Sequence, residues 1–324
     1  MTSTIETEAD QSTSTLWGPL DGHHCCWYAV GLSSDLARGQ LKGMDFCDGQ
    51  IVLYRGEDGV ARATTPYCPH MGANLSVGKV VGNDLQCAFH HWQFGPDGHC
   101  TVIPSGDRIP KSANVFAFPV EEKWGLIWVF FGRAPLYPVP SFPNWDEDKY
   151  VTRSFVVPLS EPLRVDPWVF STNLFDFQHF EVVHEIPGLN PKVTWHEWGG
   201  EWTSEVAHPT ITKMTMQARM WGVSSLVSRS VRGSEELIYL ACTSPLGREG
   251  LTAFMCVAAE KGDSAEEILD QQQALHSELI QEDVQIMNTM RIGGALFSAS
   301  DRNMVRYLRY VHNYPRTRMK DLEA

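Results

Sequence analysis

The first half of the chain consists of short hydrophobic runs separated by turn-forming residues. Two such runs are residues 50–54 and 124–131, and Gly, Asp and Pro punctuate the segments between runs, as in residues 55–59. Short apolar runs with frequent turn signals are typical of β-strands joined by tight turns. The pattern continues from Trp17 to Phe142 and predicts a small all-β domain.

A proline-rich segment marks the end of this domain. Residues 135–143 contain four prolines, and proline is excluded from helix interiors and from central strands. We therefore predict an all-β domain over 17–142 and a second domain over 143–324. Residues 1–16 are rich in Ser, Thr and Glu and lack the basic start and apolar stretch of a secretory signal, so we expect a disordered tail.

The second half of the chain mixes two periodicities. Residues 173–184, and residues 265 to about 290, carry helical patterns. Residues 210–220 place Met and Ala mainly on one side and polar side chains on the other, as in a half-buried strand, and residues 251–259 are apolar throughout. Together with the first half, this mixture predicts an α+β fold.

Composition and charge narrow the possible functions. The 324 residues are 43% hydrophobic with a formal net charge of −13, so we expect a buried core and no nucleic-acid partner. No run reaches the roughly 18 apolar residues of a membrane span, and we expect a cytoplasmic protein. The eight cysteines lack the spacing of a disulfide framework, and in a reducing compartment Cys beside His more often indicates a metal site.

The strongest chemical signal is a pair of short motifs, Cys68-Pro-His70 and Cys87-Ala-Phe-His90, with sixteen residues between them. Two Cys and two His can hold tetrahedral zinc, but a zinc finger usually takes both cysteines from one loop. One Cys and one His in each loop instead suits a [2Fe–2S] cluster, with two thiolates on one iron and two imidazoles on the other.

A second group of candidate ligands lies in the helix predicted over 173–184. His179 and His184 are five residues apart, which places them about 140° apart around an intact helix. Both can face one metal only if the helix ends or distorts near His184, and the Pro-Gly pair at 187–188 favours such an end. Asp176 is three residues before His179 and shares its helix face.

Two His and one carboxylate form the ligand set of many non-heme Fe(II) sites, and two neighbouring residues compete to supply the carboxylate. Asp283 lies in the middle of the apolar stripe of the predicted helix, whereas Glu282 lies at its edge. A carboxylate that faces a core needs a compensating partner. An Arg or His could serve instead of a metal, and the pattern alone leaves both open. With the upstream motifs and the His pair, we favour Asp283 as a metal ligand.

Both groups of residues resemble motifs of the Rieske non-heme iron oxygenases. The run from Tyr67 to Ser76 (Tyr-Cys-Pro-His-Met-Gly-Ala-Asn-Leu-Ser), then residues 87–94 and 97–100, look like the family's Rieske loops. Respiratory Rieske proteins carry an additional cysteine in each loop, which is absent here. Gly commonly follows the second His in the family, and this chain has His91. Because His tolerates positive φ better than most residues, we expect His91 to be structural. We also expect the His-His-Cys-Cys run at 23–26 to be structural, because adjacent strand residues point to opposite faces.

The resemblance implies a role for each candidate residue. The implied ligands of the [2Fe–2S] cluster are Cys68, His70, Cys87 and His90. The implied ligands of the mononuclear Fe(II) are His179, His184 and Asp283. Asp176 corresponds to the carboxylate that bridges an iron-ligating His and a Rieske His of the neighbouring subunit, and Asn173 to an active-site Asn near the iron. The resemblance also implies a catalytic domain in which a curved antiparallel sheet supports the iron helices.

The implied activity is that of the terminal oxygenase component of a multicomponent system. It would use O₂ to hydroxylate or oxidatively demethylate a hydrophobic steroid-like, alicyclic or aromatic compound, with electrons passing from the cluster to the mononuclear iron. The chain has no dinucleotide-binding motif, so NAD(P)H would act through a separate reductase, with or without a ferredoxin. The chain length resembles the homotrimeric branch, which includes ketosteroid hydroxylases and O-demethylases. The alternatives are an aromatic-ring dihydroxylating dioxygenase and a Rieske electron carrier without oxygenase activity.

Overall fold

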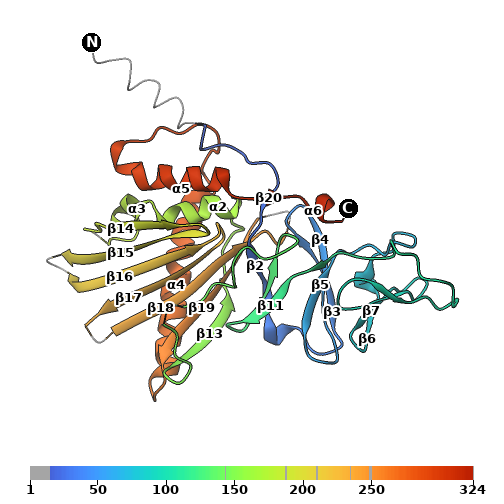
Figure 1. Cartoon of the computed structure of the whole chain (residues 1–324). Coiled ribbons are helices and arrows are strands. Elements are labelled where there is room, and N and C mark those ends of the chain that lie inside the picture. Colours follow the sequence, from blue (N-terminus) through green and yellow to red (C-terminus); the bar gives the residue numbers. More distant parts are fainter. Residues whose placement is uncertain are drawn as a thin grey trace, which may run out of the picture.

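The computed structural model (Figure 1) describes residues 15–142, 144–186, 188–208, 211–233, 235–247 and 250–323. A projection of small sheets forms one end of the molecule, and a larger sheet with helices forms the other. Most of the predicted tail, residues 1–14, lies outside the described residues. Within the described ranges, every helix is too short or too polar to cross a membrane.

The N-terminal region folds into three small antiparallel sheets. The first contains β11 (Val120–Lys123), β12 (Leu126–Phe130) and β2 (Trp27–Leu32) in that order. The second contains β10 (Ala117–Phe118), β5 (Ala61–Thr64), β4 (Gly49–Arg55) and β3 (Leu41–Phe46). The third contains β6 (Lys79–Val81), β7 (Asp84–Gln86), β8 (Gln93–Phe94) and β9 (Cys100–Val102). The predicted runs at 50–54 and 124–131 are strands of these sheets, and the all-β prediction is confirmed.

The loops that carry the Cys-and-His motifs have a hydrophobic core of their own. Cys68 and Cys87 are buried there beside Phe94. The remaining N-terminal strands share one larger core with the second half of the chain, in which Trp27 and Phe254 both take part. The motif loops are therefore packed separately from the bulk of the molecule, at the end where β6 and β7 project (Figure 1).

The larger sheet has seven antiparallel strands in the order β13-β19-β18-β17-β16-β15-β14. Their bounds are β13 (Tyr150–Val156), β14 (Lys192–His196), β15 (Gly199–His208), β16 (Ile211–Trp221), β17 (Ser225–Arg232), β18 (Glu235–Ser244) and β19 (Thr252–Glu260). The predicted strands at 210–220 and 251–259 correspond to β16 and β19, although residue 210 lies outside the described ranges. The α+β fold class is confirmed.

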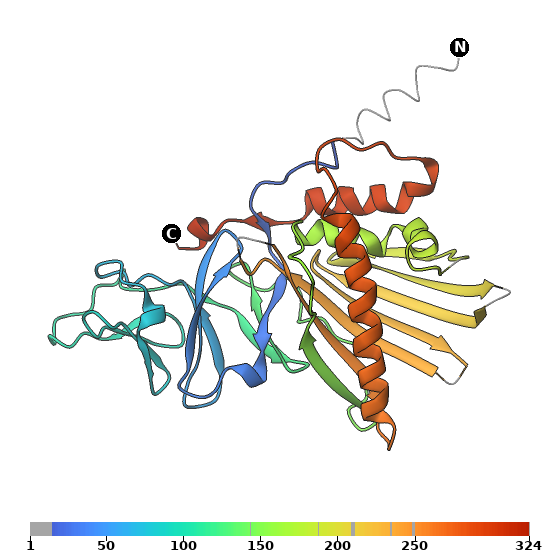
Figure 2. The same cartoon turned by 180° about the vertical axis from the view of Figure 1, so that it is seen from behind.

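Helices from three parts of the sequence pack beside this sheet. The long helix predicted from residue 265 is α4 (Ala265–Met287), which crosses one face of the sheet against β19 (Figure 2). The short helices α2 (Pro167–Phe170) and α3 (Phe177–Val182) lie near α5 (Arg302–Asn313), above the sheet in Figure 1. The second half thus places two helical segments, α3 and α4, on the same sheet.

The prediction of one helix over residues 173–184 is wrong in its extent. The segment forms a 3₁₀ turn, η3 (Ser171–Leu174), and then the short α3. Asp176 separates them because it is the N-cap of α3, and its carboxylate accepts hydrogen bonds from the backbone N–H groups of Gln178 (3.2 Å) and His179 (3.4 Å). An N-cap residue has non-helical dihedrals, so the cap separates η3 from α3, and α3 itself ends at Val182, before residue 184.

The two ends of the described chain tie the N-terminal and C-terminal regions together. Strand β20 (Arg316–Thr317) pairs with β1 (His23–His24), and α6 (Met319–Leu322) follows it. At the other end, the rings of Trp17 and Trp168 are 5.6 Å apart. Segments near both ends of the chain therefore contact residues on the other side of the predicted boundary after residue 142. The position of that boundary stays a prediction.

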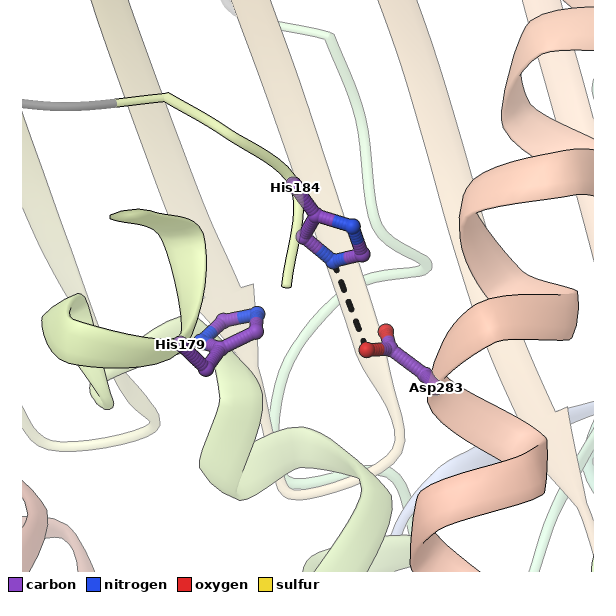
Figure 3. Close-up of side chains that lie close together, drawn as sticks. All are labelled: His179, His184 and Asp283. Atoms are coloured by element: carbon purple, nitrogen blue, oxygen red, sulfur yellow. Dashed lines mark ion pairs between the residues drawn. The ribbon is translucent and has the colours of Figure 1, made fainter. Parts of the chain in front are cut away.

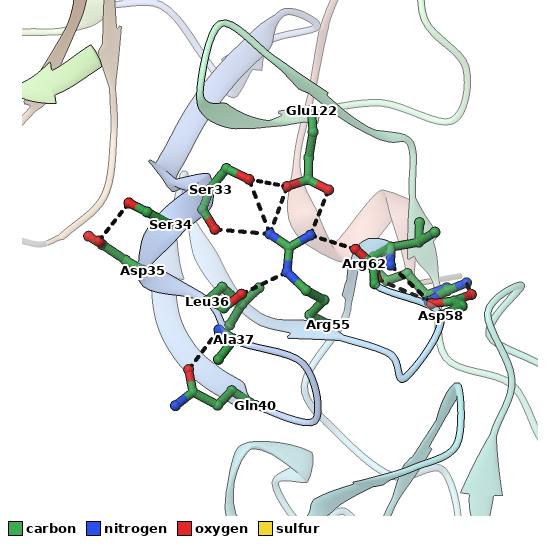
Figure 4. A network of polar contacts seen from close by, with 12 residues as sticks. Ser33, Ser34, Asp35, Leu36, Ala37, Gln40, Arg55, Asp58, Arg62 and Glu122 are labelled. Atoms are coloured by element: carbon green, nitrogen blue, oxygen red, sulfur yellow. Dashed lines mark hydrogen bonds and ion pairs between the residues drawn. The ribbon is translucent and has the colours of Figure 1, made fainter. Parts of the chain in front are cut away.

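A network of hydrogen bonds and an ion pair links strands and loops of the N-terminal region (Figure 4). Arg55, which is buried at the end of β4, forms two 2.7 Å contacts with the carboxylate of Glu122 on β11. The same guanidinium donates to the backbone carbonyls of Leu36 (2.7 Å), Ser33 (3.0 Å) and Gly59 (2.6 Å). A planar guanidinium suits such a convergence because its donors have a fixed fork geometry.

We expect Glu122→Gln to weaken this region in a pH-dependent way. Hydrogen bonding to Arg55 lowers the pKa of the Glu122 carboxyl. The ion pair therefore stabilises the fold above the carboxyl's unfolded pKa of about 4.3 and is lost as the pH falls through the lower folded value. A loss of roughly 1 kcal/mol corresponds to a melting temperature about 2–4 °C lower at neutral pH.

Thermal unfolding followed by circular dichroism at several pH values measures this effect. The deficit of the variant should shrink as the pH is lowered from about 6 toward 3. The matched control is Glu121→Gln, because Glu121 is exposed and points to the opposite face of β11. An equal deficit at all pH values, or in both variants, would contradict the assignment.

Candidate functional site

The two motif loops repeat one backbone design. In the first loop, the backbone N–H of Cys68 donates to Ala73 and that of Gly72 donates back to Cys68, both at 2.9 Å. In the second loop, Cys87 pairs in the same way with Trp92 (2.9 Å) and His91 (3.1 Å). Each cysteine therefore begins a tight turn that directs the side chains of its loop toward those of the other.

Both turns require a left-handed residue at the same place. The residue four positions after each cysteine has positive φ, at 74° in Gly72 and 58° in His91. This confirms that His91 can replace the glycine of the usual pattern without opening the turn. Asn, Asp and His are the non-glycine residues that adopt this region most readily.

The four donor residues of the loops fall into two chemically distinct pairs. Cys68 and Cys87 are buried, whereas His70 and His90 are exposed with ring centroids 4.5 Å apart. The ring of Trp92 stacks on His70 at 4.5 Å and nearly parallel. Burial raises the pKa of the Cys68 thiol to about 11, although backbone N–H groups at His70 and Met71 oppose the shift.

This arrangement fits a binuclear cluster better than a single zinc ion. Two buried thiols side by side become thiolates only beside strong positive charge, and iron supplies that charge. A mononuclear tetrahedral site would bring all four donors to one point. Among the described residues, the donor atoms that converge within 4.8 Å belong to another group of residues and not to these two loops. The paired thiols and paired imidazoles of the loops instead match two irons with different ligands.

The converging group consists of His179, His184 and Asp283 (Figure 3), which come from three separate segments. His179 lies on α3, His184 lies just after its end at Val182, and Asp283 lies on α4. His184 Nε2 is 3.3 Å from Asp283 Oδ1. The early end of α3 is what allows both imidazoles to face the carboxylate, as the five-residue spacing requires. Two imidazoles and one carboxylate fit the facial ligand set of non-heme Fe(II).

Each imidazole has an acceptor on its outer nitrogen. His184 Nδ1 donates to Glu282 Oε2 at 3.0 Å, and His179 Nδ1 donates to the backbone carbonyl of Asp176. Because a carboxylate and a carbonyl accept, these contacts favour the Nδ1–H tautomer in both rings, and a metal bound between the rings and Asp283 would take the lone pair of each Nε2. Glu282, the carboxylate that competes with Asp283 in the sequence, is therefore an orienting group for His184, and its side chain is 44% exposed.

The expected contact between the Asp176 carboxylate and His179 is wrong in one detail. The carboxylate caps α3, and it is the main-chain oxygen of Asp176 that meets the ring of His179. One carboxylate oxygen, Oδ1, accepts both capping bonds. The sequence spacing correctly placed Asp176 beside His179, but spacing does not distinguish a side-chain oxygen from a backbone one.

The pKa values of the two imidazoles shift in opposite directions. Burial lowers the pKa of His179. Burial acts in the same direction at His184, but the carboxylates of Asp283 and Glu282 outweigh it and raise the pKa of that imidazole. The carboxylate pair thus creates negative potential at the position where the three donors converge, which favours a cation there.

A cavity of about 340 Å³ opens beside the three donors. Asn173 lies in its wall, with its amide 4.0 Å from the sulfur of Met287. The rest of the wall is mostly apolar and comes from the segment around α3, from α4 and from the sheet, where Met214 and Met216 of β16 contribute. A second cavity of about 650 Å³ shares Leu237 and Leu275 with the first. Cavities of this size hold small organic molecules.

Several polar residues of this cavity were not identified from the sequence. They are Ser228, Ser230, Tyr239 and His276. Period-two alternation could have grouped the first three on the inner face of β17 and β18. The seven-residue spacing between His276 and Asp283 could have placed both on one face of α4.

Comparison with known proteins agrees with both halves of this description. Residues 26–118 match the family described as Rieske [2Fe-2S] domain, and residues 129–310 match the family described as 3-ketosteroid 9alpha-hydroxylase C-terminal domain. The NdmA QL mutant of Pseudomonas putida CBB5, solved with theobromine, superposes with a TM-score of 0.71 at 20% identity over 89% of both chains.

Two curated relatives are similar over part of their length. Cholesterol 7-desaturase of Bombyx mori is 31% identical over 208 residues, which cover 60% of this chain and 45% of the relative. The probable 3-ketosteroid-9-alpha-monooxygenase oxygenase component of Rhodococcus rhodochrous is 31% identical over 189 residues, covering 55% of this chain and 46% of the relative. The matched segments thus span less than half of either relative.

The fold and the two donor sets define a two-site iron protein of the Rieske type. Because the C-terminal family covers more than half of the chain, the protein belongs to the Rieske non-heme iron oxygenases, in the group that carries the 3-ketosteroid 9alpha-hydroxylase C-terminal domain.

We expect His91 to matter for backbone conformation and not for metal binding. His91→Gly should keep the visible absorption of the cluster, because glycine adopts positive φ freely. His91→Val should lower the melting temperature by about 2–4 °C, because a β-branched residue in this region loses roughly 1 kcal/mol or more. His90→Ala is the matched comparison and should bleach the cluster. Bleaching in His91→Gly would contradict the structural role.

Proposed function

We propose that this protein is the terminal oxygenase component of a Rieske system that uses O₂ to monooxygenate a hydrophobic, steroid-like or other alicyclic compound. The observation that carries the proposal is the convergence of His179, His184 and Asp283 within 4.8 Å at the wall of a largely apolar cavity. An electron carrier without oxygenase activity would need neither a three-donor site nor a cavity beside it.

The proposed roles follow the geometry. Cys68, Cys87, His70 and His90 hold the [2Fe–2S] cluster. His179, His184 and Asp283 hold the mononuclear Fe(II), which supplies O₂ activation and substrate oxidation when bound. Glu282 and the backbone of Asp176 fix the ring orientations through Nδ1, and the apolar wall excludes bulk water from the substrate. Asn173 lines the cavity near these ligands.

The proposal requires partners, because the chain carries no dinucleotide-binding motif. A separate reductase, with or without a ferredoxin, would deliver electrons from NAD(P)H to the exposed imidazoles. We further propose a cytoplasmic homotrimer, in which each Rieske end meets its neighbour's catalytic end. Tyr67, Met71 and Phe89 support such an interface, since they surround the cluster loops and are 53%, 66% and 60% exposed.

Sterol desaturation is the second candidate, because a cholesterol desaturase is 31% identical over 208 residues. Dihydroxylation of an aromatic ring remains the third alternative and uses the same donor sets. Mass spectrometry of the product separates them. One added oxygen indicates monooxygenation, two added hydroxyls indicate dihydroxylation, and loss of two hydrogens indicates desaturation.

Metal analysis tests the proposal without any substrate. Wild-type protein should contain three irons per chain, with the electron paramagnetic resonance signal of a reduced Rieske cluster. Asp283→Ala should lose one iron and all turnover while the Rieske signal stays, because only one of the two sites loses a ligand. A colourless protein with stoichiometric zinc, or only two irons per wild-type chain, would refute the oxygenase assignment.

Glu282→Ala is the matched control for Asp283→Ala. Glu282 contacts the outer nitrogen of His184, so its loss should weaken iron binding by about 10–100-fold without emptying the site at saturating iron. If Glu282→Ala lost the iron and Asp283→Ala kept it, the two carboxylates would have the opposite roles.

We expect Asp176→Asn to uncouple the two metal sites. In the proposed trimer, the carboxylate of Asp176 reaches a Rieske imidazole of the neighbouring subunit. Asn keeps the helix cap but cannot carry the negative charge. Turnover should fall by at least about 10-fold, the scale of losing a partner of a ligating histidine, while iron content and trimer mass stay unchanged.

Single-turnover oxidation of the pre-reduced Rieske cluster, with a ketosteroid and O₂ present, measures this coupling directly. Asp176→Ala is the companion variant, and it should additionally lower the melting temperature because it removes the cap. Wild-type oxidation rates in Asp176→Asn would rule out the route, as would a fully active monomer.

A further inference from the structure

His276 is a buried polar residue on the otherwise mainly apolar buried face of α4. It is 5% exposed and it lines the cavity beside the three donors. Its ring lies 4.0 Å from that of Tyr239 on β18. Its Nε2 is buried and has no hydrogen-bond partner within the described part of the protein. Burial lowers the pKa of this imidazole to about 4, so the ring is neutral at physiological pH.

An unpartnered buried nitrogen needs an explanation. Buried polar atoms in folded proteins are almost always hydrogen-bonded, and leaving one unsatisfied costs about 1–3 kcal/mol. A leucine would fill similar space without this cost. A purely structural histidine would be expected to bond a nearby acceptor, as His24 Nε2 does with the Val311 carbonyl at 3.3 Å. His276 instead lines the cavity, and its Nε2 has no partner in the described part of the protein, so a ligand in the cavity is the candidate partner.

The position of His276 relative to the donors fixes where such a ligand would be held. His276 and Asp283 are seven residues apart on one helix, which places them on the same face about 10 Å apart along the axis. The cavity wall between them on α4 is apolar, since Leu279 and Ile280 form it. A bound molecule that spans this distance has one end at the donors and the other end at the imidazole.

We propose that His276 is a specificity residue that hydrogen-bonds a carbonyl or hydroxyl oxygen of the substrate, at the end of the cavity remote from His179, His184 and Asp283. This inference rests on the proposed function and deepens it. It defines the substrate as a rigid hydrophobic molecule with an oxygen at one end. Oxidation occurs at the opposite end, roughly two helical turns away.

Three androstane probes test the inference by equilibrium dialysis against the iron-loaded, unreduced protein, so that no turnover occurs. They are androstane, which has no oxygen, androstan-3-one and androstan-17-one. The wild-type protein should bind the better ketone at least about 10-fold more tightly than androstane, the scale of one buried hydrogen bond. In His276→Leu this ratio should fall to within about 2-fold, and in His276→Gln it should be partly retained.

A second readout distinguishes recognition from a structural role. His276→Leu should keep or raise the melting temperature of the ligand-free protein, because it removes an unsatisfied polar atom. Leu279→Met is the matched control, since it reshapes the same wall one turn away without changing its polarity, and it should keep the ketone preference.

Three outcomes would overturn the proposal. They are equal binding of ketones and hydrocarbon by the wild type, an undiminished preference in His276→Leu, and no binding of any probe. None of these would change the iron content, so a failure here is distinguishable from a failure of the oxygenase assignment.

Discussion

The contact between Asp283 and His184 is the interaction on which the three-donor site depends. It joins a carboxylate from α4 to an imidazole that follows α3, at 3.3 Å and in a site with little exposure. Burying a carboxylate beside two imidazoles is costly without a cation to balance it. The seven-stranded sheet makes the contact possible, because α3 and α4 both pack beside it and so hold their side chains at a fixed separation.

The two donor sets differ in how far their ligands are exposed to solvent. The cluster loops bury their thiols and leave their imidazoles on the surface, where Trp92 stacks on one ring. The three-donor site is partly buried, and its cavity is walled by the segment around α3, the sheet and α4. An exposed edge suits electron transfer from another protein, whereas a mostly apolar cavity suits chemistry on an apolar molecule. The separate core of the cluster loops keeps the two environments independent.

Short turns and helix ends position the candidate ligands in the two regions. In each cluster loop a residue at positive φ closes the turn after the cysteine, and His91 fills that place as well as Gly72 does. In the catalytic half, the N-cap at Asp176 sets the start of α3 at Phe177. Because α3 ends at Val182, His184 lies outside the helix and can face the other two donors. Each device changes the backbone by only a few residues, yet it decides which side chains meet.

The sequence by itself predicted the class of chemistry that this protein's candidate ligands support. Local spacing predicted the ligands in the two Cys-and-His loops, whereas the set of His179, His184 and Asp283 rested on the resemblance to the Rieske oxygenases. Period-two and helical patterns located the main strands and α4, and the place of Asp283 on its stripe favoured it over Glu282. Tertiary structure decided what depends on distant segments. Only the structure shows that residues 173–184 form a 3₁₀ turn and a short helix, that Glu282 contacts the outer nitrogen of His184, and that His276 lines the cavity. Periodicity reports which face a residue occupies, but the partner on that face comes from another part of the chain.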